Sequence, residues 1–251
     1  MGMLNALRIA LSTLTLLPVS PKKWEPSEVK LSVAFYPLVG ALLGGLLALI
    51  GHLHLAHDLK TILLLLVWVL MTGAFHLDGL SDCLDGFFGG KDPDDRRRIM
   101  KEPSVGAYGV TGIVLALIFK AALLSHLLAD GENWRTLVLI PLAARWGVTL
   151  ACTIFQAPPG DKGLGSQVLG LPSYCFAIST LLSLTGGWAL LQAPSLEIFL
   201  AAGLVACGVG FLSRARIQGL TGDGMGAIIE LSEVILMFLI ILTISKGILP
   251  F

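Results

Sequence analysis

Charged residues are scarce in this sequence, and those it has cancel one another. Asp, Glu, Lys and Arg make up 14% of the 251 residues, with 17 basic and 17 acidic side chains, so the formal net charge is zero. This balance excludes the broad electrostatic attraction that nucleic-acid binding requires, and we expect no nucleic-acid partner. No polar stretch is long enough to bury a core of its own. We therefore predict a single membrane-embedded domain over residues 1–251.

Metal-binding cysteine patterns, repeats and linkers are also missing. The four cysteines are scattered without a CxxC pair or a metal-ligand pattern with histidine, so we expect small core residues. No repeat is visible, and no linker rich in Pro or Ser divides the chain. The N-terminal stretch carries Arg8 and lacks a convincing small-residue cleavage site. We predict a retained helix that lies in the membrane interface or enters the membrane partway.

The sequence is instead rich in long apolar runs. It is 55% hydrophobic, and a helix needs about 18 to 25 apolar residues to cross the hydrocarbon layer. The qualifying runs are 31–54, 59–76, 105–128, 136–156, 174–193, 196–213 and 231–249. They are continuously apolar rather than alternating, which favours helices over a barrel. We predict an all-α, polytopic integral membrane helical bundle with about seven transmembrane helices, surrounded by a lipid bilayer.

Lysine and arginine are distributed unevenly between the two ends of these predicted helices. With a cytoplasmic N-terminus, twelve of them fall in cytoplasmic segments and three on the opposite side. Because basic residues favour cytoplasmic loops, we predict a multi-pass membrane protein with a cytoplasmic N-terminus. The loops 77–104, 157–173 and 214–230 then emerge on the cytoplasmic side, where we expect the active site.

The first acidic cluster is HLDGLSDCLDGFFGG, residues 76–90. In a helix, Asp78, Asp82 and Asp85 share one face, because they are spaced i, i+4 and i+7. Three like charges repel unless water or a cation reaches them, and carboxylate oxygens are the ligands that Mg²⁺ prefers. Gly79 leaves backbone room for a bulky ligand. A merely solvated helix end is the alternative, but the position directly after an apolar run favours a metal site.

The second acidic cluster is QGLTGDGMGAIIELSEV, residues 218–234. Asp223, Glu230 and Glu233 again approximate one helix face. The glycines before this helix, which include Gly222 and Gly224, deliver backbone N–H groups that suit a phosphate. Glycine-rich turns are common, and this one lacks the Walker lysine. An ordinary tight turn therefore stays open.

Several basic residues and one histidine accompany the acids. The run Arg96, Arg97 and Arg98 is most simply explained by anionic lipid heads, whereas Lys101 is the better candidate for a phosphate ligand. Arg145 lies inside a predicted span, so it should face the bundle and find a carboxylate or phosphate partner. His76 is either a general base, a metal ligand or a hydrogen-bonded neighbour of the aspartates.

Three segments in fixed order resemble one family. FHLDGLSDCLDGFFGG, RRRIMKEPSVGAYGV and QGLTGDGMGAIIELSEV resemble the cobalamin synthases, the adenosylcobinamide-GDP ribazoletransferases of cobalamin biosynthesis. The segments ALRIALSTLTLLPVS, YPLVGALLGG and PLAARWGVTLA, the last followed by GLG, are similar to the family as well. The resemblance covers nearly the whole chain.

The resemblance implies a Mg²⁺-dependent transfer at the cytoplasmic membrane face. Adenosylcobinamide-GDP and α-ribazole, or its 5′-phosphate, would give adenosylcobalamin, or its phosphate, and GMP. The catalytic residues would be Asp78, Asp82, Asp223 and His76. The substrate-binding residues would be Gly79, Lys101, Arg145, Gly222 and Gly224. The Mg²⁺ ligands would be Asp78, Asp82, Asp85, Asp223 and Glu230. A homo-oligomer is left open.

Two other classes of membrane protein also place carboxylates near helix ends. A CDP-alcohol phosphotransferase would carry Ala-Arg shortly after the first Asp-Gly, whereas Asp78-Gly79 is followed by Leu-Ser-Asp. A cation transporter would place its acids near the membrane midplane and often shows repeat symmetry. The acids here cluster at one predicted surface, which disfavours a transporter.

Overall fold

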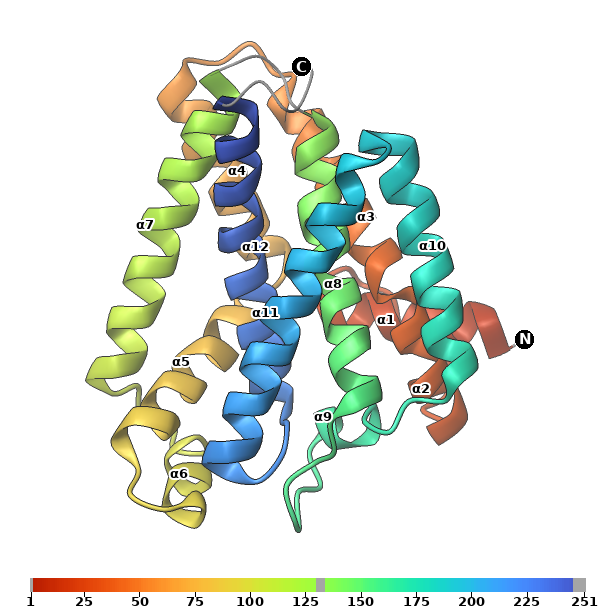
Figure 1. Cartoon of the computed structure of the whole chain (residues 1–251), viewed down its shortest axis with the longest axis vertical. Helices are drawn as coiled ribbons and strands as arrows, with labels where there is room; N and C mark the ends of the chain where they lie inside the picture. The colour runs from red at the N-terminus through yellow and green to blue at the C-terminus, as the bar shows by residue number, and fades with distance from the viewer. Residues whose placement is uncertain (1, 130–133, 246–251) are drawn as a thin grey trace.

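The computed structural model describes residues 2–129 and 134–245, and all regular structure within these ranges is helical. The long helices run side by side along one direction (Figure 1), and the predicted all-α bundle is confirmed. In chain order the elements are α1 (Gly2–Leu14), α2 (Pro26–Ser32), η1 (Val33–Phe35), α3 (Tyr36–Gly51), α4 (His57–Met71), α5 (Phe75–Gly89), α6 (Pro93–Ile99), α7 (Ala107–Ala129), α8 (Trp134–Ile154), α9 (Leu164–Gln167), α10 (Ser173–Leu191), α11 (Pro194–Ile217) and α12 (Gly222–Ser245).

Among the described residues, six helical stretches are long and apolar enough to cross a membrane, and a bent pair of helices raises this number to seven. The prediction of about seven transmembrane helices is therefore confirmed. The first and last spans begin earlier than predicted, at Pro26 instead of residue 31 and at Gly222 instead of residue 231. The acids of the second cluster therefore lie inside a helix. Residues 246–249 of the predicted last span lie outside the described ranges.

The prediction of a loop over residues 77–104 is wrong, because this segment contains most of α5 and all of α6. Helix α4 ends at Met71, and the chain bends by 80° into α5, which carries the first acidic cluster. Gly73 and Ala74 make this bend with φ angles of +61° and +57°. Alanine rarely adopts this left-handed conformation, and the bend aims α5 away from the axis of α4.

Helices α3 and α8 form the closest packed pair near the middle of the bundle. A Cβ atom at Gly40 would lie 2.3 Å from the carbonyl oxygen of Pro141, and one at Gly44 would lie 2.4 Å from that of Leu137. Glycine is required at both positions, since any side chain would collide with the α8 backbone. In α8, 72% of the span is buried, against 22% in α7 and in α10. Helix α8 is therefore the central helix.

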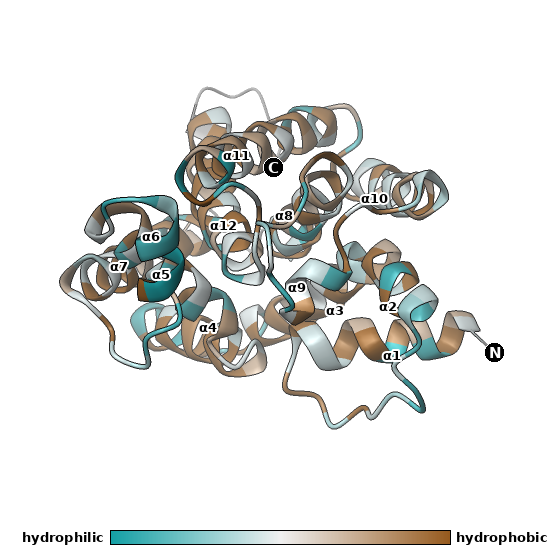
Figure 2. Cartoon of the chain, turned by 90° about the horizontal axis from the view of Figure 1, so that it is seen from below, coloured by the Kyte–Doolittle hydropathy of each residue, from teal (hydrophilic) through white to brown (hydrophobic). Residues whose placement is uncertain are grey.

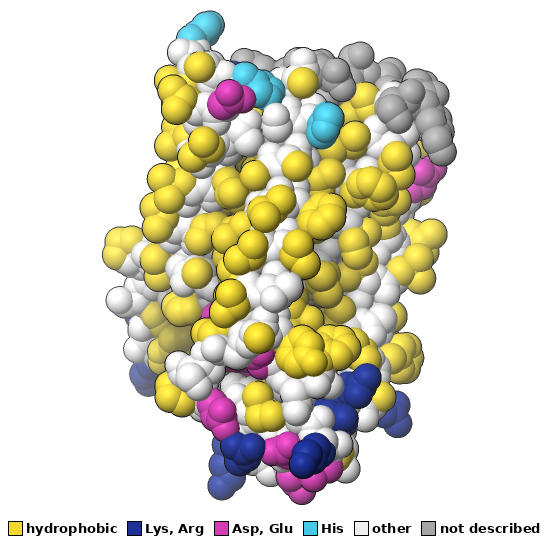
Figure 3. All heavy atoms as spheres, turned by 90° about the vertical axis from the view of Figure 1, so that its left-hand side faces the viewer, with side chains coloured by type: hydrophobic (Ala, Val, Ile, Leu, Met, Phe, Trp, Pro, Cys, Tyr) yellow, Lys and Arg dark blue, Asp and Glu magenta, His cyan; other side chains and the backbone are white. Residues whose placement is uncertain are grey.

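The two ends of the bundle differ in chemistry. Polar residues gather on α5 and α6 when the molecule is seen from below (Figure 2). In the space-filling view, Lys, Arg, Asp and Glu side chains crowd this end, and an apolar belt covers the middle of the visible face (Figure 3). Helix α1 lies across the bundle direction instead of along it (Figures 1 and 2). This matches the prediction that the N-terminal helix does not span the membrane by itself.

Candidate active site

The two acid-bearing helices, α5 and α12, cross in direct backbone contact. A Cβ atom at Gly79 would lie 2.8 Å from the carbonyl oxygen of Asp223, and one at Gly226 would lie 3.1 Å from that of His76. The prediction that Gly79 leaves room for a ligand is therefore wrong, because the α12 backbone fills that room. The glycine instead lets Asp223 approach α5.

Three predicted site residues meet at this crossing. Electrostatic interactions link Asp82 with Asp78 and Asp223, and the Asp223 carboxylate with Asp78. Asp78 is exposed, and Asp82 and Asp223 are partly buried. Within the described part of the chain, neither Asp78 nor Asp82 makes a hydrogen bond, and Asp223 has only a long one, 3.4 Å from Thr221 Oγ1. No ion pair among the described residues therefore offsets the repulsion among these three carboxylates, although the charge of Lys101 acts on Asp223.

These three carboxylates suit Mg²⁺ by their chemistry. No three His, Cys, Asp or Glu side chains among residues 2–129 and 134–245 are arranged to enclose a metal ion by themselves. Protein Mg²⁺ sites commonly use only one or two carboxylates, together with water and substrate phosphates. The donor set therefore fits a metal that is shared with a phosphate-bearing substrate, not a closed protein cage.

Asp85 has a different role from its two neighbours. Its side chain is buried, with Oδ2 accepting a hydrogen bond from Gly106 N at 2.7 Å and Oδ1 from Gly109 N at 2.9 Å. Both oxygens thereby accept hydrogen bonds from N–H groups that have no partner within α7. The negative charge of Asp85 also interacts favourably with the positive end of the α7 helix dipole. Because its oxygens fasten α7 to α5, the predicted role of Asp85 as a metal ligand gains no support from this structure.

Glu230 and Arg145 lie inside the bundle. Glu230 is 3% exposed, and its Oε2 accepts a hydrogen bond at 2.7 Å from Lys120 Nζ. Arg145 is 1% exposed and forms an ion pair with Glu233. The prediction that Arg145 faces the bundle and finds a carboxylate is confirmed. Because both side chains are enclosed by helices, the predicted metal role of Glu230 and the predicted substrate role of Arg145 gain no support from this placement.

His76 is also buried, at 6% exposure. Its electrostatic neighbours include Arg145, Glu233 and Lys120, and its Nδ1 atom makes no hydrogen bond with a described residue. It is not among the residues that line the surface pocket described below. The structure therefore groups His76 with the buried charges, and its expected role as a catalytic base has no support from this placement.

The glycine-rich turn before α12 is closed by protein contacts. A Cβ atom at Gly165 would lie 2.4 Å from Gly222 N, so α9 packs directly on this turn. The Gly224 N–H donates to Thr221 Oγ1 at 3.3 Å, the bond of a helix N-cap. Capping thus engages the N–H group of Gly224, whereas Gly222 stays exposed. Phosphate contacts of these two glycines stay a prediction.

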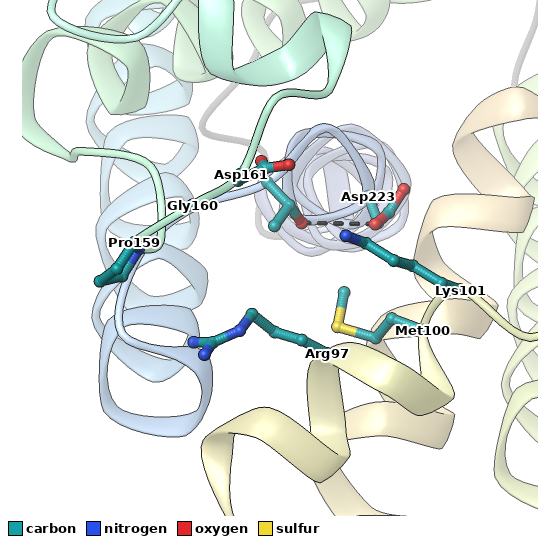
Figure 4. Close-up of a pocket in the computed structure, with 8 residues that line it drawn as sticks. Arg97, Met100, Lys101, Pro159, Gly160, Asp161 and Asp223 are labelled. Atoms are coloured by element: carbon teal, nitrogen blue, oxygen red, sulfur yellow. Dashed lines mark hydrogen bonds between the residues drawn. The ribbon is translucent and has the colours of Figure 1, made fainter.

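A pocket opens beside the aspartates at the polar end of the bundle. It has a volume of about 80 Å³, and Figure 4 shows Lys101 extending toward Asp223. The electrostatic partners of Asp223 include Lys101 and Asp161. The pocket is lined by Arg97, Met100, Lys101, Pro159, Gly160, Asp161, Thr221 and Asp223. The structure thus brings together Lys101 and Asp223, two of the predicted site residues.

Helix α6 forms one wall of this pocket and is held by two arginines. Arg96 donates from Nη1 to the carbonyl oxygen of Arg216 at 3.2 Å, and Arg97 from Nη1 to that of Ile217 at 2.8 Å. Both acceptors lie in the last turn of α11, whose free carbonyl groups attract cations. The lipid-head explanation is therefore wrong for Arg96 and Arg97.

The exposed Arg98 pairs with Asp95 at 2.6 Å. Hydrogen bonds from Arg98 and from the Lys91 backbone lower the pKa of Asp95.

Sequence reasoning missed Asp161 and Arg97 as pocket residues. Asp161 stands in the loop between α8 and α9, and its Oδ1 accepts a hydrogen bond from Gly163 N at 3.0 Å. The one available signal was PPGDKGLG, an acidic turn in a segment predicted to emerge on the same side as the other acids. Arg97 was hidden within the arginine run, where nothing in the sequence separates the three side chains.

Comparison with known proteins gives consistent matches over most of the chain. The family described as Cobalamin-5-phosphate synthase matches residues 6–241. An adenosylcobinamide-GDP ribazoletransferase of Prosthecochloris aestuarii is 37% identical over 239 residues, which cover 92% of this chain and 95% of that protein. The protein of the same name from Syntrophobacter fumaroxidans is 38% identical, and the match covers 91% of this chain and 94% of that protein. The one from Pseudomonas putida KT2440 is also 38% identical, over 90% of this chain and 93% of that protein. No solved structure matches.

Proposed function

Because the chain belongs to the cobalamin-5-phosphate synthase family, we propose that it is an adenosylcobinamide-GDP ribazoletransferase. Its active site joins the crossing of α5 and α12 to the neighbouring pocket, which is lined by α6 with the turn after it, the loop between α8 and α9, and the start of α12. A hydroxyl oxygen of α-ribazole, or of its 5′-phosphate, forms a new bond to the phosphorus on the corrinoid side of the diphosphate. The bond from that phosphorus to the oxygen of GMP breaks, and GMP leaves. The products are adenosylcobalamin, or its 5′-phosphate, and GMP, and the hydroxyl proton is released.

The observation that carries this proposal is that the acids of the helix crossing and the cations of the pocket meet at Asp223. Asp223 interacts with Asp78 and Asp82 across the helix crossing, and Lys101 extends toward Asp223 from the turn after α6. A diphosphate carries charge that a metal and a lysine can neutralise together. The pocket volume of about 80 Å³ is well below the roughly 300 Å³ or more of a site that encloses a whole ligand. It suits the diphosphate, while the corrinoid stays outside.

Mg²⁺ fits the three unpaired carboxylates of this proposed site. Asp78, Asp82 and Asp223 would hold it, and the bound ion would neutralise the diphosphate and stabilise the leaving GMP. Lys101 contributes a fixed positive charge to the phosphate from the opposite wall. Asp161 stands beside Asp223, where its carboxylate can orient the incoming hydroxyl and accept its proton.

The location of this chemistry follows from the distribution of charge. Lys and Arg side chains crowd the end of the bundle that holds the pocket (Figure 3). Since basic residues favour the cytoplasmic side, we place the N-terminus and the pocket on the cytoplasmic face of a bacterial or archaeal inner membrane. Water-soluble nucleotides reach that side directly.

Release of GMP from purified protein tests the proposal. Protein in detergent or lipid is mixed with Mg²⁺, adenosylcobinamide-GDP and either α-ribazole or its 5′-phosphate, and GMP and the corrinoid product are measured. We expect equimolar GMP and product, with no release when the ribazole or Mg²⁺ is omitted. A CDP-alcohol substrate set serves as the control. Turnover of that set, or no GMP from either ribazole form, would contradict the proposal.

A further inference from the structure

Four charged side chains form a buried cluster between α7, α8 and α12. Lys120 donates from Nζ to Glu230 Oε2 at 2.7 Å and to Glu233 Oε2 at 2.5 Å, and Arg145 pairs with Glu233. The four side chains are at most 4% exposed. Lys120 also stacks over the Trp68 ring, with Nζ 5.1 Å from the centroid. The cluster carries two positive and two negative charges, so it is neutral as a whole.

Stability alone does not account for this cluster. Burying ions is costly in a membrane span, and apolar residues of similar volume often stabilise a protein as well as a buried ion pair does. What a buried ion pair adds is direction, because its hydrogen bonds are strong only in a narrow geometry. A directional contact fixes how one helix is placed against its neighbours.

Both carboxylates of the cluster lie on α12, the helix that carries Asp223. Glu230 follows Asp223 by about two helical turns, or roughly 10 Å, and lies on nearly the same face. On the pocket side of the cluster, the backbones of α12 and α5 meet where Gly79 contacts Asp223 and Gly226 contacts His76. Glycine permits this close approach, but it offers no side chain at these two positions to fix rotation or sliding. The apolar side chains that α5 and α12 share in the core attract without a preferred direction. The ion pairs supply a directional restraint.

Helix α7 completes the connection back to α5. Asp85 of α5 binds the N-terminus of α7 through Gly106 and Gly109, and Lys120 of α7 binds α12. Helices α5, α7 and α12 are thus tied pairwise into a closed triangle. Within the described residues, Arg145 Nε and Nη2 make no hydrogen bond, which leaves Glu233 as the carboxylate that holds the central helix α8 to α12.

We propose that Lys120, Arg145, Glu230 and Glu233 are positioning residues that set the rotation and height of α12, so that Asp223 faces Asp78 and Asp82. This inference rests on the proposed Mg²⁺ site. The cluster acts at a distance from the substrate, by fixing where one metal ligand stands. Loss of the cluster should therefore weaken Mg²⁺ use and turnover more than it weakens folding.

The decisive variant is the double substitution Lys120→Met with Glu230→Gln. It keeps side-chain volume and overall neutrality, and it leaves the pair of Arg145 and Glu233 in place. We expect a folded protein whose thermal midpoint is close to that of the wild type, because neutral replacement of a buried pair is often tolerated. We also expect the Mg²⁺ concentration for half-maximal rate to rise and kcat to fall, each by about 10-fold or more, with little change in KM for α-ribazole.

Two further variants separate the possible failures. If Asp223→Asn retains wild-type turnover, the proposed site is wrong. If Asp223→Asn is inactive while the double variant has the wild-type Mg²⁺ response and kcat, the site stands and the positioning role is wrong. If the double variant does not fold, Lys120→Arg decides, since it keeps the charge but changes the geometry. A raised Mg²⁺ requirement in a folded Lys120→Arg protein supports the proposal, and an unchanged one overturns it.

Discussion

At the scale of single residues, Asp82 stands out by its acidic surroundings. It interacts electrostatically with Asp78, Asp85 and Asp223, and it makes no hydrogen bond with any described residue. Asp82→Asn removes one charge and keeps the shape. We expect turnover to fall about 100-fold or more, since a preorganised charged group in an active site is typically worth that much. The fold should be retained, because no contact is lost.

GMP release at saturating Mg²⁺ measures this effect, and the thermal midpoint reports the fold. Asp58→Asn is the matched control, because Asp58 is exposed in the first turn of α4 and is not among the acids that interact with Asp82. Near-normal turnover of the Asp82→Asn protein would refute a catalytic role for this carboxylate.

Lys101 should act on substrate binding. Its side chain extends toward Asp223 in the pocket, where a point charge attracts phosphate oxygens. We expect Lys101→Met to raise KM for adenosylcobinamide-GDP by about 10-fold, the effect of losing about 1.4 kcal/mol of binding. The KM for α-ribazole should change little. Steady-state kinetics, with each substrate varied in turn, measure both KM values. Lys162→Met is the control, because Lys162 is exposed and follows the pocket residue Asp161 in the chain. An equal rise in both KM values would contradict a diphosphate contact.

At the scale of elements, α6 is a short helix whose position depends on contacts with α11. Arg96 bonds to Gly90 and Arg216 carbonyl oxygens, whereas the neighbouring Arg98 pairs with exposed carboxylates near itself. We expect Arg96→Met to loosen α6, since a seven-residue helix is unstable alone. Hydrogen exchange of residues 91–101 should become faster by about 10-fold. Arg98→Met is the matched control, and equal exchange in both variants would show that Arg96 does not hold α6.

The elements also show which information the sequence contains. Apolar runs predicted the spans, because about 20 apolar residues must cross the hydrocarbon layer whatever the neighbours are. Gly40 and Gly44 are four residues apart, a spacing of small residues that permits close helix packing, and both glycines do meet α8. The bend at Gly73 and Ala74 was missed, since TGAF continues the apolar run without Pro or a polar break.

The candidate site was predictable only in part, because partners far apart in sequence decide the role of an acid. Asp78, Asp82 and Asp85 look equivalent by spacing, yet Asp85 alone binds amide groups that follow it by 21 and 24 residues. Glu230 looks like a ligand until Lys120 is found opposite it, 110 residues earlier in the chain. Local pattern identifies which helix face carries the acids, and only the tertiary fold assigns their contacts.

At the scale of the whole molecule, the two ends of the bundle must face different compartments. The pocket end is rich in Lys and Arg (Figure 3), so the positive-inside tendency predicts that Lys91 is cytoplasmic and Asp58 is not. Single cysteines at these exposed positions test this prediction in a Cys207→Ala background, where the other three cysteines are buried.

In intact cells, a membrane-impermeant maleimide should label Asp58→Cys and should label Lys91→Cys only after permeabilisation. The reverse pattern would put the pocket on the outer face, away from the cytoplasmic supply of nucleotide substrate. It would then contradict the proposed location while leaving the helix arrangement intact. A bundle with one polar, basic end and one apolar belt has only these two orientations, so the two labelling reactions decide between them.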